Sequence, residues 1–192
     1  MKKIITSVSV FILLFCVYSN TAFSQSPTSP ALGFNVFTEN FATLKTNESE
    51  GPVAVGGDLN IDGNYAVAVH SPGSFLVGGI PIALLVQGKV NYTSGNSLNI
   101  LNNGYVKIGN PTGSNVWYFD QNNAPSPLRI TPNSNYNATP RIELSANANQ
   151  LGVSVNSNPV FQNNLIDFAA AFSTMRSTST SMSQCEHNVV IK

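Results

Sequence analysis

The sequence predicts a mainly β fold with one amphipathic helix near its end. From Val53 to about Val155, short apolar runs are interrupted by Gly, Asn and Pro, which is typical of short strands joined by tight turns. A strand phrase also recurs: VGGDLNI (55–61) and VQGKVNY (86–92), 31 positions apart, share Val, a Gly in third place and apolar residues in fifth and seventh place. GYVKIGN (104–110) is a more degenerate third copy. Recurring strand-plus-Gly units favour a β-solenoid (β-helix), and a two-sheet β-sandwich is the alternative.

The first 24 residues have the composition of a signal peptide. Lys2 and Lys3 precede an apolar run from Ile4 to about Tyr18, and small residues follow at Ala22 and Ser24. The apolar run is shorter than the roughly 20 residues that a spanning helix needs. We therefore expect cleavage near residue 25, a secreted or cell-surface protein, and no membrane insertion after cleavage.

The rest of the chain divides into a short leader and one domain. Residues 25–31 (QSPTSPA) are rich in Pro and Ser and are expected to be a flexible leader, and residues 32–192 form the domain. Residues 32–44 suggest a strand leading into a helical turn, which the acidic cluster ending at Gly51 interrupts.

The hexapeptide DLNIDG (58–63) matches the opening of a calcium-binding EF-hand loop. The bidentate Glu that closes such a loop would fall at position 69, which is Val69. Alternation instead predicts a strand with Leu59 and Ile61 pointing inward, followed by an Asp62-Gly63 turn. We expect no cofactor, and the alternative is a weak surface calcium site at Asp58, Asn60 and Asp62. Gly56 and Gly57 are expected to allow a tight corner or a close approach between coils.

After residue 155 the apolar period changes to that of a helix. One stripe recurs at steps of three and four, and consists of Phe161, Leu165, Phe168, Phe172 and Met175. With Asn158 as N-cap and Pro159 as first helical residue, the Ser/Thr run at 177–181 would end the helix. The predicted helix spans about 159–180.

Composition narrows the classes of function. Charged residues make up 9% of the chain, and without residues 1–24 seven Lys and Arg face nine Asp and Glu, a net charge of −2. No basic stripe remains for nucleic acid or anionic lipid. Cys185 is the only cysteine after cleavage, so no internal disulfide framework is expected.

No motif points to catalysis, and we predict that the protein is not an enzyme. Cys185, Glu186 and His187 have no oxyanion-hole signature, and no HExxH or GxSxG occurs. The rival hypothesis is a carbohydrate-active enzyme on a β-helix, using Glu48 with Glu50 or Asp58 with Asp62, which requires two carboxylates in one groove. An ice-binding surface would need a Thr-x-Thr ladder, and the Thr residues here are scattered.

Two separated phrases resemble the choice-of-anchor A family, which comprises exported bacterial surface domains regarded as adhesins. They are VAVGGDLNI (53–61) and IDFAAAF (166–172), and the resemblance runs from about residue 32 to the end. It implies a right-handed parallel β-solenoid with a helix packed along it, related to ice-binding-like proteins, and a role in adhesion. Gly56, Gly57, Asp167 and Phe168 match as structural landmarks, and the family supplies no catalytic or ligand residues.

The resemblance also carries an expectation about the C-terminus. Members usually continue with further strands and an anchor, whereas only CEHNVVIK follows the helix here. We expect a C-terminally truncated product or an anchor on another chain. The predicted function is an adhesin-like domain whose polar faces bind an extracellular glycan, matrix or cell-surface protein through many weak contacts. Tyr92, Trp117 and Tyr118 are either contact aromatics or buried side chains.

Overall fold

The computed structural model describes residues 26–184. The predicted signal peptide and the Cys185-Glu186-His187 group lie outside these residues. Within residues 26–184, no helix is long and apolar enough to cross a membrane.

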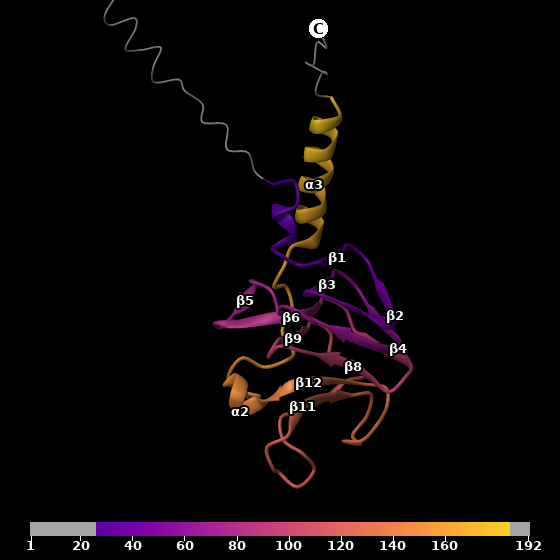
Figure 1. Cartoon of the computed structure of the whole chain (residues 1–192), viewed down its shortest axis with the longest axis vertical. Coiled ribbons are helices and arrows are strands. Elements are labelled where there is room, and N and C mark those ends of the chain that lie inside the picture. Colours follow the sequence, from indigo (N-terminus) through magenta and orange to yellow (C-terminus); the bar gives the residue numbers. More distant parts are fainter. Residues whose placement is uncertain (1–25, 185–192) are drawn as a thin grey trace, which may run out of the picture.

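The fold is mainly β, as predicted, and its strands form two open sheets (Figure 1). In the first sheet β1 (Val36–Thr38), β3 (Val53–Val55), β6 (Ile80–Val86) and β9 (Tyr105–Ile108) run parallel in that order, and β5 (Leu76–Val77) joins β6 as an antiparallel hairpin. Successive segments of the chain alternate between the two sheets, so each sheet is built from strands distant in sequence.

The second sheet is longer and ends in an antiparallel portion. Its parallel strands are β2 (Ala42–Ser49), β4 (Leu59–Val67), β7 (Val90–Ser94) and β8 (Ser97–Ile100), which both pair with β4, and β12 (Arg141–Asn147). Antiparallel β11 (Pro127–Thr131) and β10 (Asn115–Trp117) complete it.

The 31-residue recurrence is confirmed by the strand register. Val55 pairs with Val86, and Leu59 pairs with Val90, so equivalent positions of the two phrases lie side by side. The third copy follows a different register, because Ile108 rather than Gly104 lies beside Val86. The apolar residues of the third copy align with those of β6, but the sequence comparison placed the start of this copy at the wrong residue.

The glycine corners bring backbone directly against backbone. The amide of Gly88 donates to the carbonyl of Gly57 at 2.9 Å, and the amide of Asn110 donates to Gly88 at 3.1 Å. A side chain on Gly57 would collide with the carbonyl of Asn40. Gly57 is therefore required by the close approach of neighbouring turns rather than by an unusual φ.

The core lies between the two sheets and consists of inward aliphatic rows. Its fully buried members include Val53, Val55, Leu59, Ile61, Leu84, Leu98, Ile100, Val106 and Ile108. Strands β3 and β9 are buried on both faces. The second face of the first sheet must therefore be covered by another part of the chain.

That cover is residues 152–167, hereafter the connecting segment, which runs from α2 (Ala148–Leu151) past the first sheet to α3 (Phe168–Ser183) (Figure 1). It forms a bridge to β9 between Phe161 and Ile108. A row of register partners lies on the outer face of the first sheet: Phe37, Ala54, Leu85 and Lys107. The segment meets this row at Lys107, and α3 meets it at Phe37.

The predicted helix start was wrong by about nine residues. Asp167, not Asn158, is the N-cap, and its carboxylate accepts the amide of Ala170 at 2.9 Å. Asn158 has φ 56°, outside the helical region. The start shifts because Phe161 is held in the bridge to β9 instead of joining the helical stripe.

The predicted helix end was also wrong. Thr178 and Ser181 hydroxyls donate to the carbonyls four residues earlier, so these side chains fit within the helix and it continues to Ser183. Its first turns dock on the first sheet, where the Phe37 ring stacks on Phe168 at 4.8 Å and on Phe172 at 5.3 Å. Further along, α3 contacts η1, and Arg176 pairs with Glu39 at 2.8 Å. The rest of α3 projects from the stack (Figure 1).

Three smaller predictions also need correction. Residues 32–44 hold no helical turn but contain β1 and the start of β2. Strand β4 continues through the predicted Asp62-Gly63 turn, with Gly63 at φ 137° where the register with β2 shifts. The expected flexible leader is ordered at its end, where η1 (Ser29–Ala31) forms and Ala31 is buried.

Candidate binding surfaces

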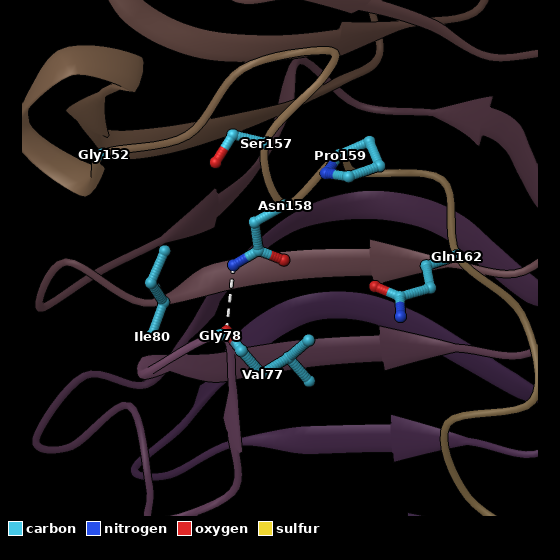
Figure 2. A pocket seen from close by; sticks show the side chains of 8 residues that line it. All are labelled: Val77, Gly78, Ile80, Gly152, Ser157, Asn158, Pro159 and Gln162. Atoms are coloured by element: carbon cyan, nitrogen blue, oxygen red, sulfur yellow. Dashed lines mark hydrogen bonds between the residues drawn. The ribbon is translucent and has the colours of Figure 1, made fainter.

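A pocket of about 510 Å³ lies between the β5–β6 hairpin and the connecting segment (Figure 2). Asn158 stands at its centre and donates its carboxamide hydrogen to the carbonyl of Val77 at 2.9 Å. Apolar and polar residues both line it: Val77, Gly78, Ile80, Gly152, Ser157, Asn158, Pro159 and Gln162. A mixed lining of this kind suits a ligand with both hydroxyl groups and C–H surface.

Behind this lining lies a fully buried lysine, Lys107 of β9. Its ammonium donates to Asn158 Oδ1 at 2.5 Å, to the Pro159 carbonyl at 2.6 Å and to Gln162 Oε1 at 2.8 Å. All three acceptors are neutral. Burial lowers the pKa of Lys107 to about 8, so most of these side chains are protonated at neutral pH.

Tyrosine hydroxyls complete the attachment of the connecting segment. Tyr105 donates to the carbonyl of Asn158 at 2.9 Å, and the Tyr118 hydroxyl accepts the amide of Val160 at 3.0 Å. Burial, followed by the proximity of Tyr118, raises the pKa of Tyr105 well above its ordinary value, so it stays neutral. The segment is thus held by neutral hydroxyls and one cation.

The structure does not gather the three predicted contact aromatics into one surface. Tyr92 bonds Ser114 through its hydroxyl at 3.1 Å, and burial raises its pKa to about 12. The Trp117 indole donates to Thr131 at 2.9 Å, and Tyr118 belongs to the connecting-segment attachment. Each is partly buried and engaged within the domain.

Sequence reasoning missed a cluster around Trp117 on the second sheet. The Tyr136 ring packs edge-on against Trp117 at 5.6 Å, and the Arg129 guanidinium lies 4.3 Å from the Tyr136 ring centre. Glu143 accepts hydrogen bonds from Arg129 at 3.2 Å and from Arg141 at 2.6 Å. Burial opposes its ionisation, but these hydrogen bonds prevail and lower its pKa. The alternation of buried and half-buried residues in β11 and β12 places Arg129 and Glu143 on the outer face. Only the register of the two strands makes these residues partners.

The predicted alternation in DLNIDG is confirmed: Leu59 and Ile61 are fully buried. The polar residues around them hydrogen-bond the neighbouring segment, residues 89–94. Asp58 accepts the Lys89 amide at 3.0 Å, Asn60 accepts from Asn91 at 2.9 Å, and Asp62 accepts from the Ser94 hydroxyl at 2.7 Å.

The three DLNIDG side chains thus act as links between strands. Across residues 26–184, no group of three or more His, Cys, Asp or Glu side chains is arranged to hold a metal ion.

The four carboxylates of the enzyme alternative lie on β2 and β4 or directly beside these strands. Asp58 lies directly before β4 and Asp62 lies within it. Four residues of extended chain separate them by about 13 Å at roughly 3.3 Å per residue, which exceeds the separations used by glycosidases. Glu50 is exposed and contacts the His70 side chain. Glu48 is exposed on β2.

Polar side chains thus cover the outer face of the second sheet, while the first sheet is closed by its connecting segment and a docked helix. The protein is thus a mainly β domain with one covered sheet and one sheet that presents a polar face. A family model described as "Putative Ice-binding-like adhesive domain" matches residues 27–192, and the protein belongs to this family. Searches among curated proteins and among solved structures found no match.

Proposed function

We propose that the protein is a secreted or cell-surface, non-enzymatic adhesin-like domain that binds a glycan or matrix polymer with the outer face of its second sheet. The observation that carries the proposal is a hydrogen-bonded amide row across three strands. Asn91 donates to Asn60 at 2.9 Å, and Asn60 donates to Thr43 at 3.3 Å. The row repeats polar groups at the strand spacing of about 4.8 Å, so a polymer with a regular repeat can contact several of these groups in succession.

The same face continues to the Trp117 cluster. Register partners lead from Asn99 of β8 to Glu143, then to Arg129 and finally to Trp117. The cluster adds aromatic and guanidinium surface to the same sheet, in a row that reaches β4 at Ala66 rather than at Asn60. Such groups commonly dominate binding energy, and the neutral row supplies additional weak contacts.

We also propose that the stack is a right-handed parallel β-solenoid of the choice-of-anchor A type. The strand register and the meeting of the two resembling phrases support this. The Phe168 ring lies 2.8 Å from the position that a Cβ on Gly56 would occupy, so the AVGG corner receives the start of α3. A larger residue at position 56 would displace this ring.

The proposed function is tested by a glycan and matrix-protein array with residues 25–192 and the double variant Asn60→Lys/Asn91→Lys. We expect binding to polymeric ligands, with loss of at least about tenfold in the variant because two bulky charges interrupt the row. The matched control is Asn149→Lys on exposed α2. If the double variant binds as well as the wild type while all three chains remain folded, this face is not the binding surface.

A further inference from the structure

We propose that the pocket beside Asn158 and Gln162 binds a carboxylate-bearing sugar unit, of the uronic acid class. This inference rests on the proposed adhesive function for the source of the ligand, an acidic glycan. It concerns a different site from the amide row of the second sheet. Three features of the pocket support this inference: the charge behind it, the orientation of its amides and the shape of its lining.

The first feature is the positive charge of Lys107, which no acidic side chain neutralises. The Lys107 ammonium is held by two carboxamide oxygens and a peptide carbonyl. Among residues 26–184, the ion pairs join other groups: Lys45 with Asp62, His70 with Glu50, Arg129 and Arg141 with Glu143, and Arg176 with Glu39. The pocket lining itself contains no acid or base. A carboxylate in the pocket would therefore be the nearest counter-charge to Lys107.

The second feature is the orientation of the side-chain amides of Asn158 and Gln162. Because Nζ draws the oxygens of Asn158 and Gln162 inward, their nitrogens face other directions (Figure 2). The Asn158 nitrogen is used by Val77. The nitrogen of exposed Gln162 has no partner within the described residues, so it is a free donor at the pocket wall. A carboxylate accepts such hydrogen bonds, whereas a cation would be repelled.

The third feature is the rest of the pocket lining. Val77, Ile80 and Pro159 offer apolar surface for the C–H face of a sugar ring. Gly78 and Gly152 add no side chains, which leaves the entrance wide. A volume of about 510 Å³ accommodates one sugar unit with solvent at its ends.

The test compares methyl galacturonoside with methyl galactoside, which differ by a carboxylate against a hydroxymethyl group. Titration calorimetry with residues 25–192 should show at least about tenfold tighter binding of the acidic sugar. Lys107→Met, which keeps a long unbranched side chain and removes the charge, should abolish this preference. Ser157→Trp should block the pocket, whereas Asn156→Trp, on the neighbouring exposed residue, should bind like the wild type.

Equal affinity for the two sugars, no measurable binding of either, or unchanged binding by Ser157→Trp would overturn the inference. If Lys107→Met does not fold, Gln162→Ala replaces it and should weaken the preference for the acid. The two proposals fail separately. If the Asn60/Asn91 variant loses polymer binding but the domain binds no uronoside, only the pocket proposal fails. If the domain binds the uronoside but the Asn60/Asn91 variant keeps its polymer binding, only the amide-row proposal fails.

Discussion

Replacement of Lys107 by Met should change how the stability of the domain depends on pH. The ammonium is fully buried, and burial lowers its pKa from 10.5 to about 8. Between these pH values the unfolded chain holds a proton that the folded chain has released. The free energy of unfolding therefore rises with pH in this window, by up to about 1.4 kcal/mol per pH unit and about 3 kcal/mol in total.

The wild type should gain this stability relative to Lys107→Met, which has no proton to release. Urea unfolding followed by Trp117 fluorescence at several values from pH 7 to 10.5 measures the difference between the two free energies. Titration of Tyr92 and Tyr105 affects both chains and cancels in that difference. Lys45→Met is the control, since its side chain is 75% exposed.

The difference between wild type and Lys45→Met should stay flat. A flat difference for Lys107→Met as well would refute the reasoning. It would mean that the three carbonyl acceptors fully replace water around the ammonium, so that its pKa in the folded chain equals that in the unfolded chain.

Three further predictions concern the helix, the corners and calcium. Phe168→Ala should lower the free energy of unfolding by about 3–5 kcal/mol, because the ring is 4% exposed, whereas Met182→Ala on the projecting part of α3 should change it by less than about 0.5; equal effects in urea titrations would contradict the docking. Gly57→Ala should lower the melting temperature measured by circular dichroism, because the added methyl collides with a carbonyl; an unchanged value would show that the corner can open. Calcium or chelator should leave the melting temperature unchanged, because Asp58 and Asp62 already bond neighbouring strands; a rise with calcium would show a metal site.

The local patterns predicted the strands well because their causes are local. The alternation around Leu59 and Ile61 follows from the two-residue period of a strand, and both side chains are buried as expected. The need for glycine at position 57 follows from size alone, because a Cβ there would collide with the carbonyl of Asn40. These signals need no knowledge of the partner strand, although the register that pairs residues 55 and 86 had to be inferred from the repeat.

The sequence by itself determined the mainly β class, the inward rows, the glycine corners and the presence of one helix, since each depends on backbone period and side-chain size. Only the tertiary structure decided where the helix begins and what Lys107 does. In GYVKIGN, Lys107 alternates with Val106 and Ile108 as a solvent-facing residue would. The connecting segment covers that face, and the ammonium then finds three neutral oxygens from residues more than 50 positions away. Local periodicity assigns a side chain to one face of a strand, but whether water or protein lies beyond that face depends on long-range packing.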